Sequence, residues 1–151
     1  MKFEKFLKGC GTHGLVLERS NGDKWLVCSG VGMLVPRGVV NLLGAGEVSE
    51  KAKNIVEALV RADTDDRVML KRATVPADGK ASDIVRVFGS IDDLSEHIEI
   101  GILNADFGLL EKADVNLAEV EIEESDIVVK YLLVLNRDND VIGFIEGVNN
   151  I

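Results

Sequence analysis

The sequence predicts an α+β fold in which antiparallel strands dominate and one main helix packs on them. Two hairpin-like stretches stand towards the ends of the chain, at about 13–30 and 129–148. One strongly amphipathic segment spans about 49–63, and the segments after it have the period of β-strands. Because strands flank this helix instead of alternating with more helices, the pattern favours antiparallel pairing over a doubly wound parallel sheet.

The bulk composition is that of one globular domain. With 151 residues and a 46% apolar share, we expect a single domain spanning 1–151. The net charge of -9 and the lack of a basic cluster argue against general nucleic-acid binding, because phosphate contacts need Lys or Arg. We expect no signal peptide and no membrane span. Two cysteines make no disulfide framework, so we expect a reducing, cytoplasmic compartment.

The first elements along the chain are a short helix and a hairpin. Residues 2–8 carry apolar side chains at helical spacing, which predicts a short helix or an arm packed on the sheet. These side chains are Phe3, Phe6 and Leu7. The pair Asn21-Gly22 between two apolar runs then predicts a tight hairpin turn with positive φ at both positions.

The second arm of this hairpin is apolar on both sides, which predicts a central strand. Trp25 and Val27 face one side, and Leu26 and Cys28 face the other. The C-terminal hairpin repeats the LVL of the first, the following arginine and the turn asparagine. Because the chain has no second copy of the helix, we do not interpret this likeness as an internal duplication. Two hairpins with the same turn requirements explain it. We expect the two hairpins to be neighbours in one antiparallel sheet, with the helix laid across it.

The stretch 29–46 is apolar but is broken by five glycines and Pro36. A proline cannot donate to a sheet, so any strand here lies at an edge or ends at the proline. The stretch either folds under the core or presents an apolar surface to a partner. Its candidate interface residues are Met33, Leu34, Val35, Val39, Val40 and Leu42.

The main helix is predicted from about 49 to 63. Ser49 is a suitable N-cap, and Glu50 suits the first turn of a helix. Glu57 and Arg61 form an i, i+4 pair in the favourable order. One apolar stripe indicates a single buried face. This stripe consists of Ala52, Ile55, Val56, Leu59 and Val60.

The remaining strands are predicted at 67–75, 83–88, 97–103 and 117–123, in addition to the arms of the final hairpin. A turn is expected at 76–79, and a single capped helical turn is expected at 90–94. The clearest alternation places one set of side chains inward and a set of glutamates outward. The inward residues are Ala118, Val120 and Ile122, and the outward ones are Glu119, Glu121 and Glu123.

Two motifs suggest ligands. The glycine-rich turn 44–49 before the helix resembles part of a dinucleotide fingerprint, but Glu47 would point negative charge at a phosphate. An ordinary turn into a helix explains this glycine-rich segment better.

Asp63 to Asp66 and Asp138 to Asp140 resemble the beginnings of calcium loops, yet neither continues with the required glycine and glutamate. A helix exit and a hairpin turn explain them.

The cysteines and histidines leave two alternatives open. Cys10, His13 and Cys28 could bind zinc if His97 or a carboxylate supplied a fourth ligand, although a structural site normally has two paired knuckles. A Cys10 or Cys28 nucleophile with a histidine base would make a small enzyme. We expect neither metal nor cofactor, because one knuckle and no catalytic motif are present.

Several segments resemble small uncharacterised proteins of bacteriophages and prophages. They are GTHG at 11–14, NGDKWLV, GVGMLVP, GVVNLLG, KASDIVRVFG, NADFGLL and VIGFIEGV. The resemblance implies a non-enzymatic structural or accessory phage protein, associated with the capsid or head, in the host cytoplasm or the virion. It would act by self-assembly or by docking to another phage protein. The alternatives are a small-ligand or nucleotide-binding anti-defence protein and the small cysteine enzyme.

Overall fold

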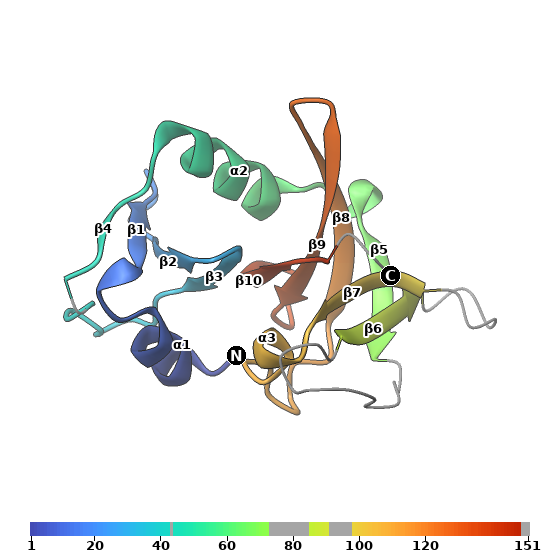
Figure 1. The fold of residues 1–151 in the computed structure, drawn as a ribbon, viewed down its shortest axis with the longest axis horizontal. Helices are drawn as coiled ribbons and strands as arrows, with labels where there is room; N and C mark the ends of the chain where they lie inside the picture. The colour runs from blue at the N-terminus through green and yellow to red at the C-terminus, as the bar shows by residue number, and fades with distance from the viewer. Residues whose placement is uncertain (43, 73–84, 91–97, 149–151) are drawn as a thin grey trace.

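The computed structural model describes residues 1–42, 44–72, 85–90 and 98–148, and its described strands form one sheet. The sheet is mixed, with the order β4-β1-β2-β3-β10-β9-β8-β5-β6-β7 (Figure 1). All pairs are antiparallel except β1 with β4. The fold is therefore mostly β with some helix, as expected. The strands are β1 (Leu15–Glu18), β2 (Lys24–Cys28), β3 (Val31–Leu34), β4 (Gly46–Glu47), β5 (Val68–Arg72), β6 (Val85–Ser90), β7 (Ile98–Leu103), β8 (Leu117–Glu124), β9 (Ile127–Leu135) and β10 (Val141–Glu146).

The two expected hairpins exist, but they are not direct neighbours. The first is β1–β2 and the second is β9–β10, and β3 lies between them in the sheet. A tight turn at Ser29 and Gly30, both with positive φ, leads from β2 into β3. Of the two expectations for a strand in 29–46, the edge position is wrong, because β3 is central, and the end at the proline is confirmed. Pro36 ends this central strand after Leu34, so no missing N–H falls inside the sheet.

The turn at Asn21-Gly22 is not the expected two-residue turn. Only Gly22 has positive φ there, and the Gly22 N–H donates to the Arg19 carbonyl at 2.9 Å. The Arg19 N–H also donates to the Asp23 carbonyl at 2.8 Å. These bonds define a three-residue loop whose last residue is left-handed, the next most common hairpin connection. Two consecutive positive φ values occur instead at Ser125-Asp126, between β8 and β9.

The two faces of the sheet bury separate cores, and the helices cover one core each. Helix α1 (Phe3–Cys10) packs its apolar side on one face, as its spacing predicted. Helix α2 (Glu50–Arg61) packs Val56 and Leu59 on the other, against β8 and β10 (Figure 1). Its Ser49 cap is confirmed, because the Ser49 hydroxyl accepts from the Ala52 N–H at 3.2 Å. Leu26 and Trp25 of β2 enter opposite cores, which confirms a strand buried on both faces.

An aromatic cluster fills the core beneath α2. The Trp25 ring stacks on Phe144 with centroids 5.9 Å apart, and Tyr131 meets Phe144 edge-on at 6.0 Å. Phe144 pairs with Gly32 across β10 and β3, and its ring occupies the space that a side chain at Gly32 would need. Gly32 is therefore required where the two parts of the sheet meet.

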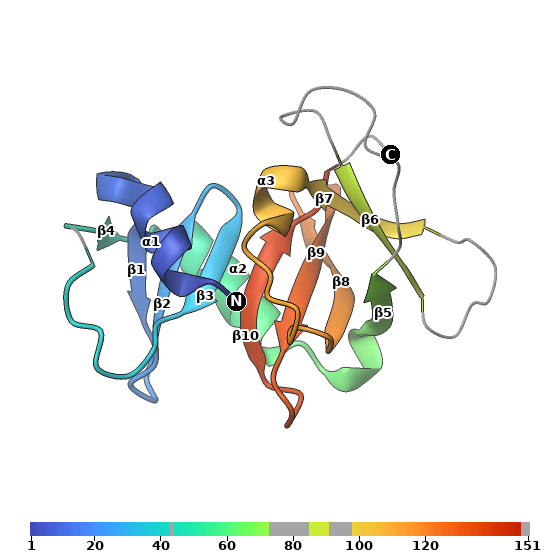
Figure 2. The same ribbon diagram turned by 90° about the horizontal axis from the view of Figure 1, so that it is seen from below.

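The far part of the sheet curls on itself. Strand β7 comes back against β9, and the Val148 N–H donates to the Gly101 carbonyl at 2.9 Å (Figure 2). This curl overturns one prediction: Glu119 is 4% exposed instead of outward-facing. Its side chain lies on the same face as that of its paired residue Leu132, which belongs to the core on the α1 side. Glu121 and Glu123 are exposed as predicted.

The four later strands are found close to their predicted positions, as β5, β6, β7 and β8. Three sequence features lie outside the described residues: the predicted turn at 76–79, most of the single helical turn at 90–94, and the candidate ligand His97. Three short helices were not predicted. They are η1 (Gly11–His13), η2 (Thr64–Asp66) and α3 (Asn104–Phe107).

Candidate functional site

A pocket of about 390 Å³ opens where the two parts of the sheet diverge. Pairing between β3 and β10 ends at Met33 and Gly143, so Leu34 and Ile142 separate beyond it. Ile142 is also the extra residue of a bulge in β10, because Val141 pairs with Leu135 and Gly143 with Val134. A bulge bends a strand and redirects its side chains. The bend leaves a space that is lined on its helix side by Val60 of α2.

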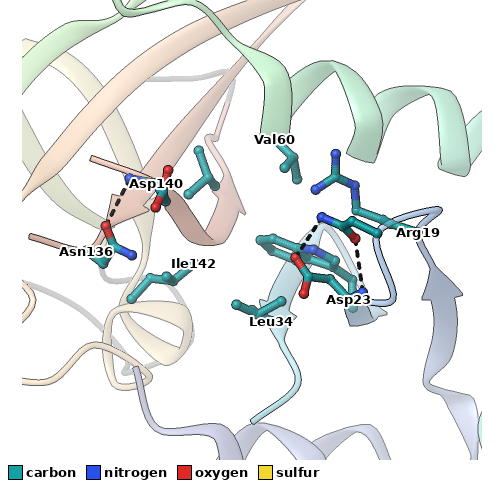
Figure 3. Close-up of a pocket in the computed structure, with 10 residues that line it drawn as sticks. Arg19, Asp23, Leu34, Val60, Asn136, Asp140 and Ile142 are labelled. Atoms are coloured by element: carbon teal, nitrogen blue, oxygen red, sulfur yellow. Dashed lines mark hydrogen bonds between the residues drawn. The ribbon is translucent and has the colours of Figure 1, made fainter. Parts of the chain in front are cut away.

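Two hairpin turns form opposite walls of this space, which we call the two-turn pocket. Arg19, Asn21 and Asp23 come from the β1–β2 turn, and Asn136 and Asp140 come from the β9–β10 turn. Figure 3 shows Asp140 and Asn136 facing Asp23 and Arg19 across the pocket. The remaining lining residues are Trp25, Leu34, Val60, Val141 and Ile142.

Hydrogen bonds hold each wall in place. Asn21 accepts from the Asp23 N–H at 3.0 Å and donates from Nδ2 to the Asp23 carboxylate at 3.1 Å. In the other wall, Asn136 Oδ1 accepts from the Asp138 N–H at 2.9 Å and the Asp140 N–H at 3.0 Å. Arg67 braces the second turn, because its guanidinium donates to the Asn139 carbonyl at 2.9 Å. The polar groups are thus positioned by the local backbone before any ligand is present.

The charge of the pocket is close to balanced and slightly negative. Arg19 Nε lies 3.1 Å from Oε1 of Glu57 in α2, and Arg61 Nε lies 3.2 Å from Oε2 of the same carboxylate. This triad has a net charge of about +1, which the Asp23 and Asp140 carboxylates more than offset. Two facing carboxylates raise the cost of placing an anion here.

Trp25 gives the pocket an unusual donor. The residue is 1% exposed and lines the pocket, and among the described residues its indole N–H has no hydrogen-bond partner. A buried donor without an acceptor costs about 1–3 kcal/mol, so most such donors find one. The indole N–H is therefore an unused donor in a residue that lines the pocket.

A second exposed feature is the end of the β8–β9 hairpin, residues 123–128, which we call the hairpin tip. Figure 1 shows it projecting beyond the rest of the sheet. Ile127 is 61% exposed and Val128 is 52% exposed. Because adjacent strand residues point to opposite faces, the tip is apolar on both sides. Glu123 and Asp126 lie beside these residues and are exposed.

The six candidate interface residues do not form one surface. Met33 is 1% exposed and belongs to the core, because β3 is a central strand. Val40 is 91% exposed and can be reached by a partner. Leu34 lines the two-turn pocket. Val35, Val39 and Leu42 are half-buried and pack against the core on the α1 side.

The structure brings Cys10 and Cys28 together. Burial raises the pKa of the Cys10 thiol to about 12, and the hydrogen bond and charge of Cys28 add to this shift. Cys10 is therefore a protonated, weakly nucleophilic thiol near neutral pH. His13 is exposed. No group of three or more His, Cys, Asp or Glu in the described ranges is arranged to hold a metal ion.

The glycine-rich turn and the acidic clusters adopt ordinary local structures. The strand β4 separates Gly44 from the start of α2, whereas a dinucleotide fingerprint needs a direct strand-to-helix turn. Asp63 to Asp66 form the predicted helix exit, with the Asp66 N–H donating to the Asp63 carbonyl at 3.0 Å. Asp138 to Asp140 form the predicted hairpin turn.

No protein-family model matches the chain, and neither curated proteins nor solved structures give a significant match. In the part of the chain that the structure describes, none of the helices has the length and apolar character needed to cross a bilayer.

The polar lining of the two-turn pocket was missed from the sequence. The sequence predicts both turns, but it does not show that their side chains line one space. One clue was available, since each turn ends in an aspartate after a left-handed residue. These residues are Asp23 after Gly22 and Asp140 after Asn139. Their position across a common space depends on the strand order.

Proposed function

We propose that the protein is a non-enzymatic docking protein that binds another protein through its hairpin tip. The single observation that carries this proposal is the projecting tip with Ile127 and Val128 exposed on opposite faces. Adjacent exposed apolar side chains on a projecting hairpin offer a partner an apolar contact surface. A partner must enclose the tip from both sides to bury both residues.

Charge favours a different protein over a second copy of this chain. Glu124 is paired with Lys51 at 2.7 Å and Glu121 with Lys130 at 3.9 Å, whereas Glu123 and Asp126 add negative charge beside the apolar pair. Two copies meeting tip to tip would bring these carboxylates together, on chains that each have a net charge of -9. A groove rimmed with Lys or Arg complements the tip.

The resemblance to small bacteriophage and prophage proteins suggests where such a partner occurs. We infer a structural or accessory role in which the chain docks to a virion component, in the infected cytoplasm or on the particle. The raised pKa of Cys10 argues against the alternative in which this thiol is a catalytic nucleophile.

The test combines a tip variant with a matched control. The double variant Ile127→Ser/Val128→Ser removes the apolar tip, and Val115→Ser changes a single apolar residue that is 66% exposed elsewhere. Cosedimentation of purified protein with phage particles should be lost in the tip variant, kept in the control and weakened by salt. Light scattering should give a monomer. A monomer that binds no phage particle contradicts the proposal, as does binding that the tip variant retains.

A further inference from the structure

We propose that the two-turn pocket binds a neutral, polyhydroxylated ligand of the size of a monosaccharide or the end of a glycan chain. This site is distinct from the hairpin tip and does not rest on the docking proposal. Its volume of about 390 Å³ lies within the usual range for small-ligand pockets.

The balance of donors and acceptors excludes simple ions as preferred ligands. An anion would meet the Asp23 and Asp140 carboxylates from the two walls. A cation could pair with those carboxylates, but it would offer no acceptor to the Trp25 indole and would face the Arg19 guanidinium. The preferred ligand must therefore donate and accept hydrogen bonds at neighbouring positions.

Hydroxyl groups meet this requirement, because each one donates a hydrogen bond and also accepts. Sugar hydroxyls can donate to Asp140 and Asp23 and accept from the buried Trp25 N–H. The apolar lining by Leu34, Val60 and Ile142 suits the C–H groups of a sugar ring (Figure 3). Charge-assisted bonds to the carboxylates are the stronger ones, so Asp140 and Asp23 should determine affinity.

Binding in the pocket can be followed by tryptophan fluorescence, because Trp25 is the only tryptophan in the chain. We would titrate the full-length protein with glucose, galactose, mannose, N-acetylglucosamine, maltose and chitobiose, and follow tryptophan fluorescence together with the unfolding temperature. At least one sugar should give a saturable fluorescence change and a concentration-dependent rise in unfolding temperature. Tighter binding of a disaccharide than of its monosaccharide would indicate a glycan end over a free sugar. Inorganic phosphate and arginine amide are the ionic probes.

Isosteric variants of the second turn test the assignment. Asp140→Asn keeps the shape of the side chain but removes a charged acceptor, and it should weaken sugar binding about tenfold. Asp138→Asn changes a neighbouring exposed carboxylate that does not line the pocket, so its affinity should stay within about twofold of wild type. Trp25→Phe removes the N–H but keeps a ring, and sugar should stabilise it less, provided that urea unfolding shows it is folded.

Three results would overturn the proposal. The first is that no sugar in the panel changes either signal up to the limit of its solubility. The second is that phosphate or arginine amide binds while the sugars do not. The third is that Asp140→Asn and Asp138→Asn bind sugar equally well, which would place the ligand elsewhere.

Discussion

The turns Arg19–Asp23 and Asn136–Asp140 have the same backbone hydrogen bonds but are supported by different side chains. In each turn the first residue accepts a hydrogen bond from the N–H of the fourth residue and donates its own N–H to the carbonyl of the fifth. The fourth residue has positive φ. That fourth residue is Gly22 in one turn and Asn139 in the other, with φ of 90° and 63°. Glycine and asparagine are the residues that tolerate this region best. A three-residue loop and one position that tolerates positive φ therefore define the turn.

The support around the two turns differs in a way that can be measured. Within the second turn Asn136 Oδ1 accepts two backbone N–H groups, whereas within the first turn Asn21 Oδ1 accepts one. From outside, Arg67 donates to the backbone of the second turn, whereas Glu57 of α2 binds the Arg19 side chain of the first.

Asn136→Ala should be the most destabilising of these changes. It removes the acceptor of two backbone N–H groups in an exposed turn, so we expect the free energy of unfolding to fall by about 1.5 kcal/mol. The matched variant Asn21→Ala removes one such bond in an exposed turn and should cost about 0.5 kcal/mol. Urea unfolding of both variants measures the difference. Equal losses would show that the two turns are supported alike.

Gly22→Ala should lower the free energy of unfolding by about 1 kcal/mol, because alanine disfavours positive φ. No atom lies close enough to clash with an added methyl group at Gly22, so the loss would reflect backbone conformation alone. Asn139→Gly should be nearly neutral, since the turn already has the required shape. Gly9→Ala is the control: Gly9 lies in α1 with open space around it, and alanine there should stabilise the helix. A neutral Gly22→Ala would contradict the assigned turn.

Glu57→Gln should have the smallest effect, about 0.5 kcal/mol in dilute buffer and less in high salt. It removes the charge that holds Arg19 at the first turn, while the second turn has no contact with this carboxylate in the described structure. Arg61→Gln loses only the more exposed partner and should cost less still. Chemical denaturation at two salt concentrations gives both values. A loss that does not depend on salt would argue against an electrostatic role.

Much of the fold was predictable because local patterns determine elements and faces. The stripe of α2, its Ser49 cap and the two-faced strand β2 all follow from spacing and chemistry within a few residues. The strand β3 was missed because its glycines suggested a loop. Gly32 has a role that the sequence does not reveal, since it makes room for the Phe144 ring of a strand far along the chain.

By itself, the sequence determined the class of the fold, the main helix, most strands and the location of both hairpin turns. It did so because capping, side-chain period and turn chemistry are properties of neighbouring residues. Only the tertiary structure decided that β3 separates the hairpins, that the curled sheet buries Glu119, and that Asp23 and Asp140 share a pocket over Trp25. These outcomes depend on which distant strands pair and where their pairing stops. Many strand orders satisfy the same local patterns, so the packing of the whole chain selects one.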